Sequence, residues 1–264
     1  ADALRFFLAT GNTPGNDMRY SDKRVEACAN FANKLWNASR YVHMNIDDHD
    51  VKNELPKTLT TEDKWIVSTL NTVAKEVNEN LEKFELGIAV QKIYEFIWDC
   101  YCDWYIELTK SRLNGEDAQQ ADTARKVLVW VLDKALKLLH PFMPFITEEI
   151  YQALPGSAET IMTQEWPDAG KMTAWPQECA DFEVLMDYIK AVRTIRNDMN
   201  VHPAKKTSMT IETANPAAFQ KGGAYLARFA FGTDVALTEK YTGTTDGVVT
   251  VVTPAARGFI PMME

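Results

Sequence analysis

The chain has 264 residues, with 28 Lys and Arg against 37 Asp and Glu, and a formal net charge of −9. Hydrophobic residues make up 46% and charged residues 25%, which is typical of a globular chain and excludes a disordered tail, a collagen-like fibre or a disulfide scaffold. The four cysteines and four histidines are scattered without metal-ligand spacing, so we expect no metal site. Dispersed free thiols indicate a reducing compartment, and we expect a cytoplasmic location.

Helical periodicity predicts a mainly α fold in the first part of the chain. A short helix over residues 2–10 ends at Gly11, and a loop of turn residues over Gly11–Asp17 follows it. Thr60 and Asp63 resemble a capping box, with Asp in place of the usual Glu. The apolar spacing predicts four longer amphipathic helices; they cover residues 21–46, 60–84, 86–113 and 118–139. Four such helices joined by loops predict an antiparallel helix bundle.

The pattern changes after Pro155 and Gly156. Residues 156–180 read as irregular, and a fifth helix is predicted over residues 181–199. Short alternating runs then predict strands around a helical patch, which indicates a small mixed α/β subdomain; the strands are Ser208–Ile211, Val235–Leu237 and Val248–Val252, and the patch is 217–229. The predicted organisation is a connecting segment over 1–20, the bundle over 21–155, and the linker, fifth helix and subdomain over 156–264.

Charge is segregated along the chain. Residues 1–46 hold six basic and four acidic residues, a net +2, and residues 187–206 hold five basic and two acidic, a net +3. The remainder carries −14, so two segments could face phosphates while the rest stays acidic. The apolar stretch over 127–146 contains charged residues and indicates a core helix, so we expect no membrane span.

The polar face of the first long helix has an unusual composition. No acidic residue occurs between Ala27 and Ile46, although an ordinary solvated face alternates Glu with Lys. Asn is a poor helix former, so an Asn-rich stripe lowers helix stability. Amide, guanidinium and phenol groups suit the edges and faces of unstacked RNA bases. The alternative is a polar seam that contacts another helix or domain.

Other candidate residues are ambiguous on sequence alone. Trp65 begins its helix and is either a core residue or an exposed stacking platform. Arg193 and Arg196 share one helix face and could hold a phosphate or form ion pairs. The aromatic run from Tyr94 to Tyr105 is at helical spacing and reads as core. No pattern indicates a catalytic acid, base or nucleophile.

Several segments resemble the valyl-tRNA synthetases, members of the class I aminoacyl-tRNA synthetases. The segments are Asp2–Phe6 with Thr10–Arg19, then Asn30–Tyr41, Leu139–Ile150 and Ala191–Pro203. The third is shared by the valine, isoleucine and leucine enzymes, whereas the TGNTPGNDMR segment is specific for valine. The match spans essentially the whole chain.

The resemblance implies an anticodon-binding helix bundle preceded by a small region that packs on the inner side of the tRNA. It also implies what is missing from these residues: the HIGH and KMSKS motifs, the editing domain and the C-terminal coiled coil. With no initiator Met, the chain reads as an excised piece of a longer enzyme. The parent would be an ATP-dependent valine–tRNA ligase; ATP and Mg²⁺ would bind its absent catalytic domain, and this piece would hold no cofactor and no catalytic residue.

The expected partner is valine tRNA, with no DNA and no membrane, bound by a monomeric chain. We expect the anticodon to contact residues of the first two long helices, namely Asn33, Asn37, Arg40, Tyr41, Lys64 and Trp65. We expect backbone phosphates to contact Arg19, Lys23, Arg24, Arg193 and Arg196. The alternatives are an isoleucyl- or leucyl-type anticodon domain and a helical protein-interaction module.

Overall fold

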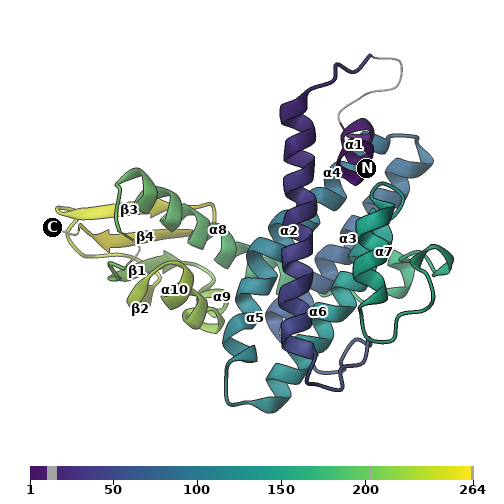
Figure 1. Ribbon diagram of the computed structural model, residues 1–264. Coiled ribbons are helices and arrows are strands. Elements are labelled where there is room, and N and C mark those ends of the chain that lie inside the picture. Colours follow the sequence, from purple (N-terminus) through teal and green to yellow (C-terminus); the bar gives the residue numbers. More distant parts are fainter. Residues whose placement is uncertain (11–16, 203, 263–264) are drawn as a thin grey trace. The chain divides into compact units, whose positions relative to one another are not determined.

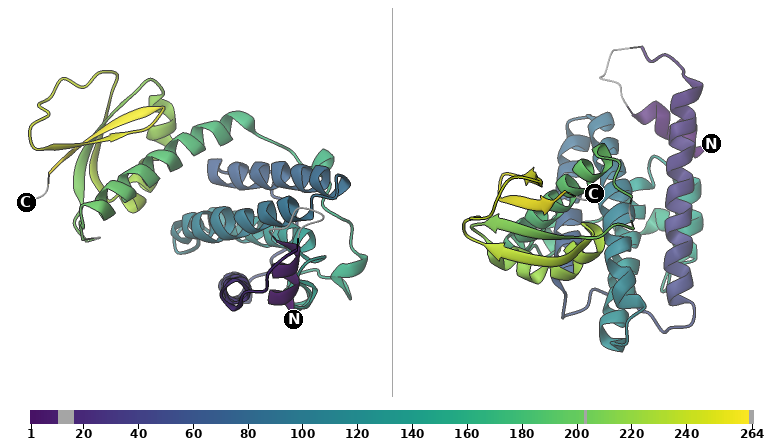
Figure 2. Two further views of the ribbon diagram at one scale, coloured as in Figure 1. Left: turned by 90° about the horizontal axis from the view of Figure 1, so that it is seen from above. Right: turned by 90° about the vertical axis from the view of Figure 1, so that its left-hand side faces the viewer.

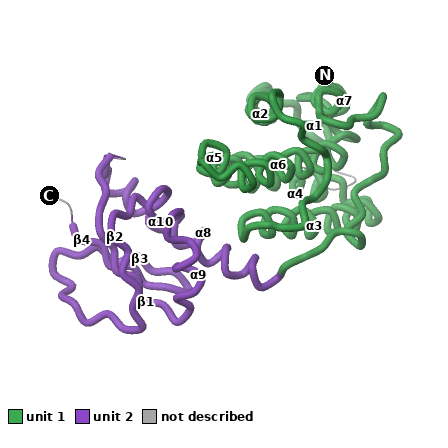
Figure 3. The backbone as a smooth tube through the Cα atoms, turned by 90° about the horizontal axis from the view of Figure 1, so that it is seen from below, with its two compact units in different colours: residues 1–175 green, residues 176–264 purple. Residues whose placement is uncertain are grey.

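The computed structural model describes residues 1–10, 17–202 and 204–262. Contacts divide the chain into two compact units, Ala1–Trp175 and Pro176–Glu264 (Figure 3). The predicted loop Gly11–Asp17 lies outside the described residues except for Asp17. No helix of the described part is long and apolar enough to cross a bilayer.

The first unit is a bundle of helices (Figure 1). Its elements are α1 (Asp2–Ala9), α2 (Asp22–Ile46), α3 (Thr61–Glu82), α4 (Leu86–Glu95), α5 (Ile106–Leu113), α6 (Ala118–Leu139) and α7 (Pro144–Gln152), with 3₁₀ turns η2 (Ile161–Thr163) and η3 (Ala169–Lys171) after them. Helix α6 is central, because it packs against α2, α3, α4, α5 and α7. Its Leu128, Leu132 and Leu136 are fully buried. The predicted helix bundle is confirmed.

A π-helical segment, η1 (Phe96–Tyr105), joins α4 to α5 without a break. Its wider turn lets adjacent residues face the interior together, and both Phe96 and Ile97 are 1% exposed. The Tyr101 hydroxyl donates to the carbonyl oxygen of Leu128 in α6 at 3.0 Å. The core role predicted for this aromatic run is confirmed.

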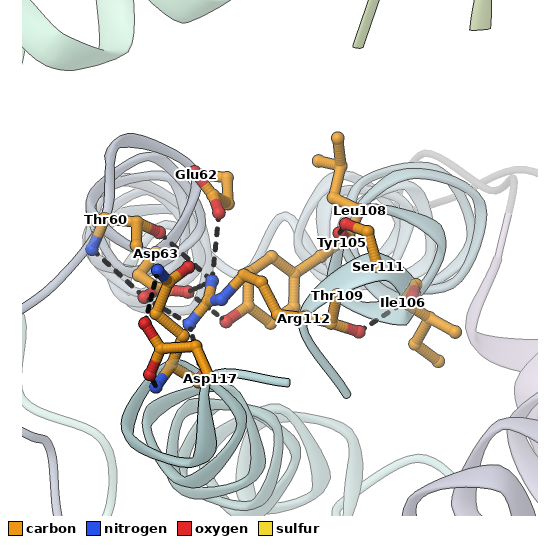
Figure 4. Close-up of polar contacts among 11 residues, drawn as sticks. Thr60, Glu62, Asp63, Tyr105, Ile106, Leu108, Thr109, Ser111, Arg112 and Asp117 are labelled. Carbon is orange, nitrogen blue, oxygen red and sulfur yellow. Dashed lines mark hydrogen bonds and ion pairs between the residues drawn. The ribbon is translucent and has the colours of Figure 1, made fainter. Parts of the chain in front are cut away.

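A buried polar network ties the start of α3 to α5 (Figure 4). Arg112 donates from Nη1 to Oδ1 of Asp63 at 2.7 Å and from Nη2 to Oδ2 at 3.0 Å. Nη1 also donates to Glu62 and to the hydroxyl of Thr60, both at 3.0 Å. The Tyr105 hydroxyl donates to Oδ1 of Asp63 at 2.6 Å. Asp63 also accepts the backbone N–H of Thr60 at 3.1 Å, which confirms the predicted capping box.

The two ends of the first unit pack onto the bundle. The Asp2 carboxylate of α1 accepts the backbone N–H groups of Phe145 and Ile146 at the start of α7, at 3.3 and 2.7 Å. The indole N–H of Trp166 donates to Asn78 of α3 at 2.6 Å. Residues 156–175 therefore belong with the bundle, and the boundary between units lies after residue 175, later than the predicted boundary after residue 155.

The second unit is a small α/β domain. Helix α8 (Pro176–Asp198) precedes β1 (Thr207–Thr213), α9 (Pro216–Lys221), α10 (Gly223–Phe229), β2 (Gly232–Thr238), β3 (Val248–Val252) and β4 (Ala256–Pro261). The sheet order is β2-β1-β4-β3 (Figure 2). Strands β1 and β2 are parallel, because α9 and α10 form the crossover, and the β1–β4 and β3–β4 pairs are antiparallel.

Helix α8 packs on this sheet through Tyr188, which is fully buried. The Tyr188 ring meets Phe219 edge-on at 5.5 Å between centroids. A Cβ at Gly258 of β4 would lie 2.0 Å from the Tyr188 hydroxyl, so only glycine allows this close approach. The three predicted strands are present, and β4 is an additional one.

Candidate nucleic-acid interface

Helix α2 lies along one outer edge of the first unit (Figure 2). Phe31, Leu35 and Val42 are fully buried on its inner side. The opposite face exposes Asn33, Asn37 and Arg40, none of which forms a hydrogen bond or ion pair with the described part of the chain. The structure therefore brings three of the six predicted anticodon residues together on one accessible face. Their donors and acceptors remain available to a ligand.

A groove runs beside this face, between α2 and α7. Its volume is about 300 Å³, at the small end of the range for ligand pockets. The lining residues are Trp36, Ser39, Arg40, His43, Met44 and Asp47 on the α2 side and Glu149, Ile150 and Ala153 on the α7 side. Arg40 is thus shared between the exposed face and the groove. A planar group in the groove would meet an aromatic ring, a guanidinium and a thioether from one helix.

Trp36 is a further candidate, which the predicted anticodon residues do not include. Its side chain is 42% exposed, and Met44 of the same helix is 77% exposed. The available signal was its position directly after Leu35: successive residues point 100° apart on a helix, so Leu35 and Trp36 cannot both face the core. An exposed Trp beside unpaired amides is a suitable platform for base stacking.

The other three predicted anticodon residues, Tyr41, Lys64 and Trp65, do not lie on this exposed face of α2. Tyr41 is half-buried, and the ammonium of Lys110 in α5 lies 5.7 Å from the centre of its ring. Lys64 is half-buried in the first turn of α3, a helix that is not among the main packing partners of α2. Trp65 is only 2% exposed. This burial contradicts the exposed stacking platform and agrees with the alternative, that Trp65 is a core residue.

Three of the predicted phosphate ligands gather at the start of α2. Arg19, Lys23 and Arg24 are all exposed. The Arg24 guanidinium lies 5.1 Å from the centre of the Phe7 ring of α1, which orients it. Cations in the first turn of a helix oppose its dipole. Asp22 lies in the same first turn and offsets part of this positive charge.

The other two predicted phosphate ligands belong to α8 in the second unit. Arg193 is exposed, whereas Arg196 is 6% exposed. Nη2 of Arg196 donates to the carbonyl oxygens of Lys205 and, at 3.4 Å, His202. Burial lowers the pKa of Arg196. Arg196 is therefore not the freely exposed surface cation that its spacing from Arg193 predicts.

Comparison with known proteins identifies the family to which this chain belongs. A family model described as the anticodon-binding domain of tRNA ligase matches residues 63–211. The chain belongs to this family. A solved structure of methionyl-tRNA synthetase from Mycobacterium tuberculosis has a similar fold over 60% of this chain and 33% of its own, with a TM-score of 0.51 and 22% identity.

Two similar proteins are valine–tRNA ligases. The one from Clostridium acetobutylicum is 44% identical over 268 residues, covering all of this chain and 30% of that protein. The one from Carboxydothermus hydrogenoformans is 48% identical over 215 residues, covering 81% of this chain and 24% of that protein. The chain thus spans less than a third of the length of these relatives.

Proposed function

We propose that this chain is the part of a valine–tRNA ligase that binds valine tRNA and reads its anticodon. The observation that carries the proposal is the face of α2 on which Asn33, Asn37 and Arg40 stand exposed and unpaired beside the groove. Family membership and similarity to valine–tRNA ligases along the whole chain support it.

Valine codons begin with GU, so the anticodon of valine tRNA has A and C at its second and third positions. Proteins read such bases in single-stranded loops by stacking and by hydrogen bonds to base edges. In this proposal Asn33 and Asn37 bond to base edges, Arg40 bonds to a base or its phosphate, and Trp36 stacks. Tyr41 and Lys64 contact the loop from the flanks. Arg19, Lys23 and Arg24 contact backbone phosphates. Phosphate contacts position the RNA but carry no sequence information, so these cations contribute to affinity and not to anticodon specificity.

The proposed activity of the whole enzyme is to couple valine to its tRNA in the cytoplasm, through a valyl-adenylate. The residues that bind ATP and Mg²⁺ for that step lie outside these 264 residues in this proposal. The chain described here contributes substrate selection: it orients the tRNA and does not take part in the bond-making steps.

The test is a binding titration of the chain with the anticodon stem-loop of valine tRNA and with its isoleucine-anticodon counterpart. We expect tighter binding of the valine stem-loop and weakening as salt rises, since displaced counterions make phosphate binding salt-dependent. Arg40→Ala should abolish the preference between the two stem-loops. Lys75→Ala is the matched control, because Lys75 is an exposed cation on α3, 70% exposed and away from the groove.

Each outcome decides between the alternatives. Preference for the isoleucine anticodon would replace valine by isoleucine in the proposal. Equal binding of both stem-loops, unchanged in Arg40→Ala, would leave phosphate contacts but overturn anticodon reading by α2. Absence of any salt-dependent RNA binding would favour a protein-interaction role for the amide-rich face.

A further inference from the structure

A hollow in the second unit has features of a ligand site. It lies at the end of α8, and its volume is about 430 Å³. The lining residues are Arg193, Thr194, Arg196, Asn197, Val201 and Phe231. Two of them are cationic, two carry neutral hydrogen-bonding groups, and none is acidic. The composition suits an anion that also offers groups for neutral hydrogen bonds.

The charge of Arg196 has no carboxylate partner among the described residues, although it is buried. Arg112 in the first unit is equally buried, but Asp63 and Glu62 balance it. Both hydrogen bonds of Arg196 use Nη2 and carbonyl oxygens, which leaves Nε and Nη1 without an acceptor in the described chain. These two nitrogens are not among the buried unpaired atoms of the described residues, so the acceptors of a ligand in the hollow can reach them.

Phe231 supplies an aromatic surface in the same hollow. Its backbone has φ of 58°, a conformation that is strained for a bulky residue and costless for glycine. The backbone N–H of Thr207 donates to its carbonyl oxygen at 3.0 Å and fixes this turn. The Arg196 guanidinium lies 4.7 Å from the centre of the Phe231 ring. A phenyl group is therefore kept at a strained position, half-exposed and next to two arginines.

We infer that this hollow binds one nucleotide unit of an RNA strand, with the phosphate held by Arg193 and Arg196 and the base packed against Phe231. The amide of Asn197 and the hydroxyl of Thr194 are placed to bond to the sugar or the phosphate. Exposed Lys206 adds positive charge on the segment that follows α8. The assignment of the ligand as RNA, among phosphate-bearing molecules, rests on the proposed function; the site itself is independent of α2.

The decisive experiment uses the full chain and a labelled single-stranded hexanucleotide RNA that lacks the valine anticodon sequence. Arg193→Ala should weaken binding about fivefold or more and reduce the slope of log K against log salt by about 0.7, the contribution of one single-strand phosphate. Lys190→Ala is the matched control, because it removes an equal charge one turn earlier on α8, outside the hollow. We expect it to change affinity less than twofold.

Phe231→Gly tests the aromatic contact. Glycine adopts the positive φ freely, so the turn is preserved while the ring is lost. We expect the affinity for the hexanucleotide to fall about five- to hundredfold, the effect of losing one stacking ring. The thermal unfolding midpoint of the variant, measured in parallel by circular dichroism, shows whether the second unit still folds. If it does not, Phe231→Leu, which keeps apolar bulk without the flat ring, takes its place and should weaken binding in the same direction.

Two probes distinguish the sources of phosphate. The Arg Nε–H resonances of the labelled chain, assigned with Arg193→Ala and Arg196→Lys, should shift with the hexanucleotide at micromolar concentration and with inorganic phosphate only at millimolar concentration. Equal response to both would make the hollow a free-anion site and overturn the nucleotide assignment. An equal loss of affinity in Lys190→Ala and Arg193→Ala would overturn the site altogether.

The same titrations separate this inference from the proposed function. Lys75→Ala, the control variant of the proposed function, should leave hexanucleotide binding unchanged. If the valine stem-loop shows no anticodon preference but hexanucleotide binding still depends on Arg193, the proposed function fails and the site stands. If the anticodon preference is present but hexanucleotide binding depends on neither Arg193 nor Phe231, the proposed function stands and the nucleotide site fails.

Discussion

Arg112 and Asp63 form a bidentate ion pair inside the first unit, although 49 positions separate them in the chain. The Arg112 side chain is 7% exposed and the Asp63 side chain is not exposed at all. Burial alone would lower the pKa of Arg112, but the hydrogen bonds and charge of Asp63 raise it above its ordinary value. The pair fixes the start of α3 against α5.

Loss of one partner from this pair should be strongly destabilising. Asp63→Ala leaves Arg112 as a buried cation and also removes the acceptor of the Tyr105 hydroxyl. We expect the free energy of unfolding of the first unit to fall by about 3–5 kcal/mol. Tryptophan fluorescence during urea unfolding measures this unit alone, because all seven Trp residues lie within residues 1–175.

The double variant Asp63→Leu with Arg112→Met provides the control for that prediction. Replacing a whole buried ion pair by apolar groups leaves no unpaired charge. The double variant should therefore lose less stability than either single variant. A loss equal to the sum of the two single losses would show that the residues act independently and would contradict the coupling.

The cap that α1 places on α7 should contribute measurably to stability. Asp2 accepts two backbone N–H groups at the start of α7, where no local side chain caps the helix. Asp2→Ala should lower the free energy of unfolding by about 1 kcal/mol, and Asp2→Asn by less, since an amide oxygen still accepts. The urea midpoint followed by Trp fluorescence is the measurement. Equal effects of both changes would indicate that only the negative charge matters.

The stability of the first unit should depend on pH through His140. Burial lowers the pKa of His140, and the carboxylates of Glu148 and Asp2 only partly offset this. The unfolded chain then binds more protons than the folded one between the folded pKa and about 6.5. Stability is therefore complete above about pH 6.5 and declines as the pH falls through that window. His140→Gln should flatten this part of the profile, whereas His49→Gln, at an exposed position, should leave it unchanged.

The helices followed from local signals. Asp117 caps α6 by accepting the backbone N–H groups of Gln119 and Gln120, and Pro141 lies directly after the C-cap residue His140, so both ends were set by neighbouring residues. The predicted and observed bounds of this helix agree. The apolar spacing of α2 likewise predicted which of its faces is buried.

The features that the sequence did not predict depend on distant contacts. Trp65 begins an amphipathic helix, and its burial depends on tertiary packing that the local sequence does not determine. Strand β4 contains Gly258 and ends at Pro261, both unfavourable in strands, yet it pairs with two neighbours that supply its stability. Residues 156–175 have no periodicity, and their attachment to α3 rests on individual contacts such as that of Trp166.

The candidate site could be predicted only in part, because some of its features also depend on distant contacts. The absence of acidic residues over 27–46 identified the polar face of α2, because local composition suffices for that. The groove could not be predicted, since α7 supplies its second wall. Trp36 and the hollow around Phe231 became candidates only when exposure and packing were known.

The last prediction concerns Trp36 and separates stacking from charge in the proposed RNA site. Trp36→Ala removes a ring that is 42% exposed, so its effect on folding should be small. Its affinity for the valine stem-loop should fall by about 1–3 kcal/mol with no change in the salt slope, because stacking releases no counterions. Arg24→Ala should show the opposite pattern, a shallower slope with an unchanged preference between anticodons. Parallel titrations at several salt concentrations measure both. A changed salt slope in Trp36→Ala would contradict the stacking role of Trp36. A lost anticodon preference in Arg24→Ala would contradict the phosphate-binding role of Arg24.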